Sequence, residues 1–301
     1  MKDVAFVAGV VVSGLSAGAG YALVGLGFTV LYRLSGVLNF AAGDLVTLGL
    51  FAFVAGVALG PGAGALVAVL VVAAVAMAVQ RLAVRPFAER GAALGWVAAI
   101  AAAGAAIRGS VRAAFPAESY SAPDLWQLSR IGSGGTVALG GGAFVDVRAV
   151  AALAAGMTLA IGIQAWLERS WTGRAIQAAS QDRQAAALVG IPAQRLQMLA
   201  WAIVGGLAAC AALLVAPGRP LSVELGVVLG LNGVAAAVVS GLESPRAAIA
   251  AGLAIGVVET AWSTFLPAPV ARAHSLLPVA LLVLAVVLAP SRLHAQESEL
   301  A

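Results

Sequence analysis

Charged residues are scarce in this chain of 301 residues. Only 10% are Asp, Glu, Lys or Arg, whereas 62% are hydrophobic and the mean hydropathy is +1.02. Soluble domains carry about a quarter charged residues, so this chain has too little polar surface to cover a soluble fold. The composition indicates an integral membrane protein. Because the seventeen basic residues form no tract, the net charge of +4 indicates membrane-flanking residues and no nucleic-acid partner.

Cysteine, histidine and lysine are nearly absent. Cys210 stands alone, which excludes an intramolecular disulfide, and His274 and His294 form no cluster with it that could hold a metal. Lys2 is the only lysine, so the Gly-rich stretch 116–142 cannot contain the GxxxxGK[ST] nucleotide loop. No paired acids or nucleophile–base constellation is evident. We therefore expect no catalytic site, no metal and no cofactor in this chain, and any ATP must be bound by another subunit.

Long hydrophobic runs dominate what is present. A membrane-crossing helix needs about 20 mostly apolar residues, and the runs are too continuous for the alternating strands of a barrel. The first run continues from Val4 to Leu31, longer than the apolar core of a signal peptide, which predicts a retained first span. The candidate spans are 5–31, 36–59, 63–80, 94–107, 146–167, 197–216, 224–241, 246–266 and 276–290. The fourth and ninth are short, so three alternatives are open for them: partly interfacial, re-entrant, or extended by neighbouring residues.

We therefore expect one all-α polytopic membrane domain over residues 1–301, with about 8–10 transmembrane helices in a Gly/Ala-rich bundle. The segments 80–91 and 168–195 both carry several arginines, which predicts that both are cytoplasmic. Two predicted spans separate them, and an even number is needed for both to lie on the same side. The polar loop at about 108–145 is then external, and the short tail 291–301 is cytoplasmic.

Glycines recur in GxxxG spacing, which lets helix backbones approach closely in a membrane. The chain holds 36 glycines, so chance alone produces several such patterns. They predict a tightly packed bundle without identifying particular contacts. The three patterns are Gly14/Gly18, Gly226/Gly230 and Gly252/Gly256.

The segment at about 168–196 is too polar to span a membrane and too patterned for a slack linker. Gly190 supplies a helix stop, and Pro192 forbids simple continuation. The segment predicts a short helix that docks into a partner's groove, or lies on the membrane or on its own bundle. The spacing places four apolar residues along one side and three glutamines away from it: Ile176, Ala179, Ala186 and Val189 against Gln177, Gln181 and Gln184.

Acidic residues within apolar runs are functional candidates by default. Asp44 follows Asn39 where one apolar run gives way to the next, so it can cap a helix, serve a pathway or interface, or mark a boundary. Arg33 is the nearest candidate for an ion pair with Asp44. Glu259 lies near the predicted outer end of its span, which favours a snorkelling, partly solvated carboxylate.

Several stretches resemble ABC importer permeases of the branched-chain amino acid (Liv) type. The family's coupling segment, GRAxRA…AxLxGI, resembles GRAIQAASQDRQAAALVGIPAQRLQ here. Its GxxxGxxYALxALGxTxxYGxxGxxNFAHGE segment resembles GLSAGAGYALVGLGFTVLYRLSGVLNFAAGDLVTLG, and its GLKAFxAAVLGGxGSxxGAxxGGxxLGxxE segment resembles GLNGVAAAVVSGLESPRAAIAAGLAIGVVE. The family's RPL and RPTGL are similar to RPF at 85–87 and to the terminal LAPSRL. The resemblance covers nearly the whole chain in the family's order.

The resemblance implies a permease subunit of a bacterial inner-membrane importer. In that family a second homologous permease, usually forming a heterodimer, completes the pathway; two ATPase subunits bind ATP and Mg; and an external solute-binding protein delivers substrate. The resemblance assigns to ATPase coupling Gly173, Arg174, Ala175, Ala186, Leu188, Gly190 and Ile191. It assigns to the pathway or helix break Asn39, Phe40, Gly43, Asp44 and Asn232.

The chain departs from the family pattern where the second half of the pathway is expected. The family's His-Gly-Glu is Ala42-Gly43-Asp44 here, its lysine is Asn232, and one of its paired glycines is Ser240. Branched-chain or other small hydrophobic amino acids are the family's default substrates, with amides, urea and short-chain organic acids as further candidates. The competing hypothesis is an ATP-independent secondary transporter or channel, whose obvious ion-coupling groups would be Asp44 and Glu259.

Overall fold

The computed structural model describes residues 2–89, 95–116, 120–121, 136–140, 143–217, 220–242, 244–271 and 276–288. The first part comprises α1 (Lys2–Ser35), α2 (Ala42–Gly56), the 3-10 helix η1 (Val57–Leu59), α3 (Pro61–Val79), the π-helix η2 (Gln80–Val84), α4 (Arg85–Glu89) and α5 (Gly95–Ala114). The second comprises α6 (Val147–Arg169), α7 (Trp171–Gln181), α8 (Arg183–Leu188), α9 (Ala193–Val215), α10 (Val223–Val239), α11 (Pro245–Phe265), α12 (Ala268–Ala271) and α13 (Leu277–Leu288).

The all-α polytopic architecture predicted from hydropathy is confirmed. Each of the nine predicted spans coincides with a helix, and seven helical stretches among the described residues are long and apolar enough to cross a membrane. The other two predicted spans correspond to shorter helices, α10 and the described part of α13. The fourth span is extended by neighbouring residues, one of the alternatives expected for it, because α5 continues for two further turns through Arg108 and Arg112.

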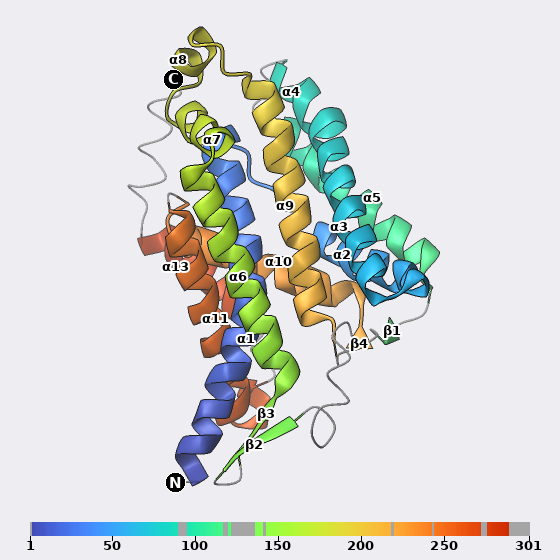
Figure 1. Cartoon of the computed structure of the whole chain (residues 1–301), viewed down its shortest axis with the longest axis vertical. Helices are drawn as coiled ribbons and strands as arrows, with labels where there is room; N and C mark the ends of the chain where they lie inside the picture. The colour runs from blue at the N-terminus through green and yellow to red at the C-terminus, as the bar shows by residue number, and fades with distance from the viewer. Residues whose placement is uncertain are drawn as a thin grey trace.

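Short strands accompany the helices. β1 (Tyr120–Ser121) pairs antiparallel with β4 (Pro220–Leu221), and β2 (Thr136–Gly140) pairs antiparallel with β3 (Ala143–Asp146). The β2–β3 ribbon lies at the end of the bundle that carries the N-terminus (Figure 1). Half of the predicted external loop, chiefly residues 122–135, and the tail 291–301 lie outside the described residues.

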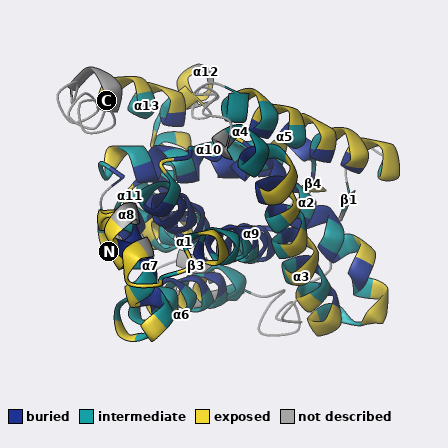
Figure 2. Ribbon diagram, turned by 90° about the horizontal axis from the view of Figure 1, so that it is seen from above, coloured by how far each residue is buried: buried dark blue, intermediate teal, exposed yellow. Residues whose placement is uncertain are grey.

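The core lies along α1, which packs against α11, α9, α10 and α6. In Figure 2 the faces that α1, α9 and α10 turn toward one another are buried, whereas α3, α5 and α6 carry exposed outer faces. Segments α4, α7 and α8 share one end of the bundle, opposite β2 and β3 (Figure 1). We refer to that end as cytoplasmic, following its arginines.

The GxxxG patterns make particular contacts that the sequence did not identify. A Cβ added to Gly14 would lie 2.7 Å from Cα of Val257, and one on Gly18 would lie 2.7 Å from Cα of Leu253. Reciprocally, a Cβ on Gly256 would lie 2.5 Å from Cα of Gly18. The glycines of α1 and α11 therefore face each other and allow backbone contact. The third pattern, on α10, packs in the same way against α2.

Two adjacent glycines on α9 give opposite expectations for alanine substitution. A Cβ on Gly205 would lie 2.6 Å from the carbonyl oxygen of Val72 on α3, so Gly205→Ala should cost about 1–3 kcal/mol through overpacking. Gly206 has only Val69 Cγ1 nearby, at 3.9 Å, so Gly206→Ala should be neutral or stabilise by up to about 1 kcal/mol. Thermal unfolding in one detergent measures both; equal shifts would contradict the packing described.

Candidate functional site

Asp44 lies in the first turn of α2, with its side chain only 5% exposed. Arg108 of α5 donates to it twice, from Nε to Oδ1 at 2.8 Å and from Nη2 to Oδ2 at 3.3 Å. The Arg108 side chain is 40% exposed, so the pair lies at the edge of the bundle with the carboxylate innermost. One turn earlier on α5, a Cβ on Gly104 would collide with the Asp44 carboxylate. A glycine there leaves room for the ion pair.

The structure corrects two expectations for Asp44. Its partner is Arg108, not Arg33, which lies near the end of α1. Asp44 does not cap α2 either, because the residue before the helix is Ala41 and no side chain caps it. The Asn39 side chain instead accepts a hydrogen bond from Ala41 N at 3.1 Å and shapes the turn before α2. Asp44 still favours the positive end of the helix dipole.

A second ion pair repeats this arrangement one turn along α5. Arg112 Nη2 lies 3.1 Å from Oε1 of Glu224, which is in the first turn of α10, and both side chains are largely exposed. Helix α5 therefore contacts the starts of both α2 and α10 through arginines four residues apart. Exposed ion pairs of this kind contribute little to stability. The pair between Arg108 and the buried carboxylate of Asp44 therefore contributes more than the Arg112–Glu224 pair to holding α5 against the bundle.

Helices α2 and α10 also touch directly. Thr47 Oγ1 donates to the carbonyl oxygen of Val223 at 3.1 Å, and a Cβ on Gly43 would lie 3.0 Å from Cα of Val227. A Cβ on Gly230 would in turn collide with the Gly43 backbone. Gly43 thus acts as a packing residue between the two helices.

Two buried side-chain amides in this region carry atoms without a hydrogen-bond partner among the described residues. Asn232 on α10 is 0% exposed, and neither its nitrogen nor its oxygen has a hydrogen bond; Asn39 Nδ2 is buried without one as well. An unpaired buried amide destabilises a fold, so such groups suggest a role other than packing. Phe40, which directly follows Asn39 in the sequence, is exposed on the surface.

Glu259 of α11 is hydrogen-bonded to a residue of α1. Tyr21 donates its hydroxyl to Oε2 of Glu259 at 2.6 Å, and the glutamate is half-buried. The expectation of a partly solvated carboxylate agrees with this exposure, and Tyr21 is the partner that sequence reasoning missed.

The polar segment forms two helices instead of the single predicted one. Helix α7 ends at Gln181, and Asp182 is extended and accepts a hydrogen bond from Ala185 N at 2.9 Å, which starts α8. We call α7 and α8 together the coupling segment, after the segment of the family that their sequence resembles. The helix breaks at Asp182, and of the two residues predicted on the apolar side beyond it, Ala186 is buried whereas Val189 is exposed. Gln177, predicted to point away, donates to Leu167 O at 2.8 Å.

Glycines fix both ends of the coupling segment. Gly173 is buried, and a Cβ there would lie 2.6 Å from Cα of Leu167 on α6; Ser170 caps α7 by accepting from Gly173 N at 2.9 Å. Gly190 ends the segment at φ +81°, as predicted, and Ile191 N donates back to Ala186 O at 3.0 Å. This is the glycine-terminated helix stop.

The remaining predicted coupling residues divide between inside and outside. Ala186 is buried, Ala175 and Ile191 are half-buried, and Arg174 is exposed and donates to Arg169 O at 3.2 Å. The large apolar side chains turned outward are Trp171, Leu188 and Val189, exposed by 81%, 89% and 76%. Of these three, only Leu188 is among the coupling residues predicted from the sequence.

An apolar bundle of closely packed helices, seven of them among the described residues long enough to cross a membrane, defines a multi-pass membrane protein. Residues 10–286 match the family described as branched-chain amino acid transport system, permease component. The chain belongs to this family, as the sequence motifs indicated, and is a multi-pass protein of the inner membrane.

Curated relatives agree with this assignment. The permease protein BraD of a high-affinity branched-chain amino acid transport system from Pseudomonas aeruginosa is 26% identical over 262 residues, covering 82% of this chain and 83% of BraD. The corresponding LivH proteins of Salmonella typhimurium and Escherichia coli are 25% and 24% identical, each covering 84% of this chain and 85% of LivH.

A solved structure shares the fold. PsaBC from Streptococcus pneumoniae, determined in complex with a Fab, superposes with a TM-score of 0.53 at 12% identity, covering 97% of this chain and 95% of the other. At that identity the similarity concerns the fold alone.

Proposed function

We propose that this chain is the permease subunit of an ABC importer that carries branched-chain or similar small hydrophobic amino acids across the inner membrane. The observation that carries the proposal is the family match over residues 10–286, which contains nearly all of the helical bundle and the whole coupling segment. The substrate class follows the names of BraD and LivH. The chain is a transport subunit and not an enzyme in its own right.

The proposed partners are two ATPase subunits that bind ATP and Mg, a second homologous permease forming a heterodimer, and an external solute-binding protein. The projecting coupling segment supports ATPase docking, because Trp171, Leu188 and Val189 expose large apolar side chains at the cytoplasmic end. Large aromatic and apolar side chains exposed on a polar segment favour a contact with a protein partner. Movement of this segment with the ATPases would shift the bundle between outward- and inward-facing states.

The competing function, an ATP-independent secondary transporter or channel, is less well supported. Its candidate ion-coupling acids are Asp44 and Glu259. Asp44 is held by Arg108 in two hydrogen bonds, and Glu259 accepts from Tyr21. An acid that is already neutralised by an arginine is a poor cation site.

The docking proposal is tested with a charge on the exposed apolar surface. Leu188→Asp should leave the bundle folded but reduce co-purification with the ATPase by about tenfold or more, as expected for a central apolar contact. The matched control is Leu59→Asp, because Leu59 is 72% exposed and lies in η1, outside the coupling segment. Unchanged ATPase association of Leu188→Asp, or equal loss in both variants, would contradict docking through this segment.

The pathway proposal rests on Asn232, whose buried amide has no hydrogen-bond partner within the described part of the chain. Asn232→Ala removes an unsatisfied polar group, so the thermal stability of the permease should rise or stay unchanged while transport falls. Asn39→Ala is the comparison, since it removes the hydrogen bond to Ala41 N and should lower stability. Full transport by Asn232→Ala would exclude a pathway role for this amide.

A further inference from the structure

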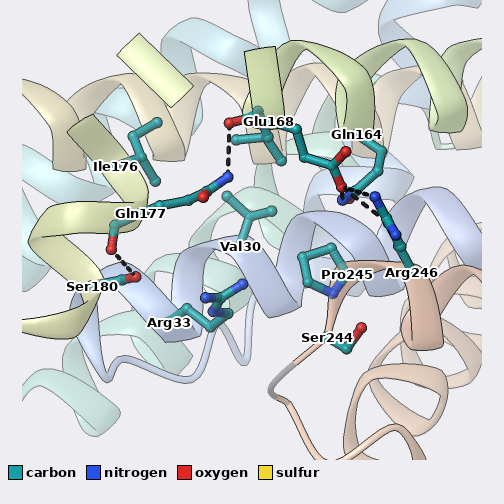
Figure 3. A pocket seen from close by; sticks show the side chains of 11 residues that line it. Val30, Arg33, Gln164, Glu168, Ile176, Gln177, Ser180, Ser244, Pro245 and Arg246 are labelled. Carbon is teal, nitrogen blue, oxygen red and sulfur yellow. Dashed lines mark hydrogen bonds and ion pairs between the residues drawn. The ribbon is translucent and has the colours of Figure 1, made fainter. Parts of the chain in front are cut away.

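A cavity of about 240 Å³ lies at the cytoplasmic end of the bundle, where α1 and α6 end and α11 begins. Its fourth wall is α7 of the coupling segment. Figure 3 shows the side chains that enclose it, and the polar ones are Arg33, Gln164, Glu168, Gln177, Ser180, Ser244 and Arg246.

The charges in this cavity do not balance. Arg246 donates to Glu168 Oε1 from Nε at 3.0 Å and from Nη2 at 2.6 Å, so these two side chains neutralise each other. Arg33 is half-buried and has no hydrogen-bond or ion-pair partner in the part of the chain that the structure describes. Two guanidinium groups and one carboxylate leave a net charge of +1 on the wall. A partly buried cation without a partner is costly, which favours an anionic ligand.

The neutral groups around Arg33 are suited to an oxyanion. Ser244 caps α11 by accepting from Ala247 N at 3.3 Å, which leaves its hydroxyl proton free to donate. The first turn of α11 also directs its positive end toward the cavity. On the opposite wall, the Ser180 hydroxyl donates to Gln177 O, and the Gln177 amide nitrogen donates one of its two hydrogens to Leu167 O. The available donors are therefore Arg33, Ser244 and the second amide hydrogen of Gln177.

We propose that this cavity binds one phosphate group, held chiefly by Arg33. The planar guanidinium fork matches phosphate oxygens in two parallel hydrogen bonds. The source of the phosphate is either the headgroup of an anionic lipid or free phosphate from the cytosol. Basic cavities between transmembrane helices on the cytoplasmic side are suited to such headgroups, and Val30, one turn before Arg33, is buried within the bundle.

Occupancy would connect the coupling segment to the bundle. Gln177 and Ser180 belong to α7, Arg33 to α1 and Ser244 to the start of α11, so a ligand between them contacts three separate elements. The bound phosphate would hold α7 against the bundle. This site is independent of the substrate pathway, and its test does not require transport.

The test uses the full chain in lipid nanodiscs. In the lipid arm, native mass spectrometry counts the phosphatidylglycerol retained from mixed nanodiscs. In the phosphate arm, inorganic phosphate is titrated into pure phosphatidylcholine nanodiscs while hydrogen exchange of α7 is followed. Wild type should retain one anionic lipid or show phosphate-dependent protection of α7. Arg33→Gln should weaken binding by about tenfold or more, as for loss of a charge-assisted hydrogen-bonding partner.

The matched control is Arg81→Gln, because Arg81 is exposed on η2 and does not line the cavity. Arg33→Lys keeps the charge and loses the fork, so it should weaken binding several-fold with unchanged thermal unfolding. A response in the first arm alone identifies a lipid and in the second alone free phosphate; both results support the site. Equal binding by wild type and Arg33→Gln, or equal losses in Arg33→Gln and Arg81→Gln, would overturn the proposal, as would Arg33 paired with an ATPase carboxylate in the assembled transporter.

Discussion

Replacing Arg108 with glutamine is expected to destabilise the permease more than any other single charge removal. The substitution leaves the Asp44 carboxylate, 5% exposed, without its ionic partner. Breaking a buried pair from one side costs about 3–5 kcal/mol, and we expect the lower end because Arg108 itself is 40% exposed. The loss should appear as a lower thermal unfolding midpoint and a lower yield of folded protein.

The control lies one turn away on the same helix. Arg112→Gln breaks an exposed pair with Glu224 and should cost less than about 1 kcal/mol. Because the penalty arises from the stranded charge, the double variant Asp44→Asn/Arg108→Gln should recover much of the stability lost in Arg108→Gln alone. Equal effects of Arg108→Gln and Arg112→Gln would show that burial of Asp44 is unimportant. If Asp44→Asn folds and transports normally, the Asp44 carboxylate has no role beyond its position at the start of α2.

Gly173→Ala is expected to uncouple ATP hydrolysis from transport while the bundle stays folded. A Cβ at this position would lie 2.6 Å from Cα and 2.7 Å from the carbonyl carbon of Leu167, and backbone of α6 cannot yield as a flexible side chain would. Helix α7 must therefore move away from α6. Overpacking of this kind costs about 1–3 kcal/mol, here concentrated at the joint that we propose transmits motion from the ATPases.

The measurement is ATP-dependent uptake by the assembled transporter, compared with its ATPase rate. Uptake should fall by about tenfold, the equivalent of about 1.4 kcal/mol, with a smaller change in the ATPase rate. Gly162→Ala is the control, since that glycine lies on α6 with open space around it. Wild-type coupling in Gly173→Ala would show that the contact between α6 and α7 does not transmit the motion.

Hydropathy alone located the membrane helices because apolar runs of spanning length have few alternatives in lipid. It misplaced the end of α5, which was expected at residue 107 and lies at Ala114. The arginines at 108 and 112 read as loop residues in the sequence, yet each is paired with an acid from another helix. Pairing makes them compatible with a helix, and a local pattern carries no information about such distant partners.

The sequence predicted only part of the candidate site, because a local pattern does not reveal partners that are distant in the chain. Asp44 was identified because a carboxylate in an apolar run is unusual, but its partner is 64 residues away in sequence and was not foreseen. The GxxxG patterns predicted close packing, whereas the pairing of Gly14 and Gly18 with α11 required the fold. The predicted apolar side of the coupling segment is buried at Ala179 and Ala186 but exposed at Val189. The chain extends at Asp182 and a second helix starts there, so the period of α7 does not fix the orientation of α8.

Uptake of labelled leucine into liposomes tests the central claim most directly. The chain is reconstituted alone, or with its ATPase, second permease and solute-binding subunits. We predict no uptake and no ATP hydrolysis by the chain alone, and uptake by the assembly only when ATP and Mg are supplied. Leucine uptake by the chain alone, driven by an ion gradient without ATP, would contradict its assignment as a permease subunit of an ABC importer.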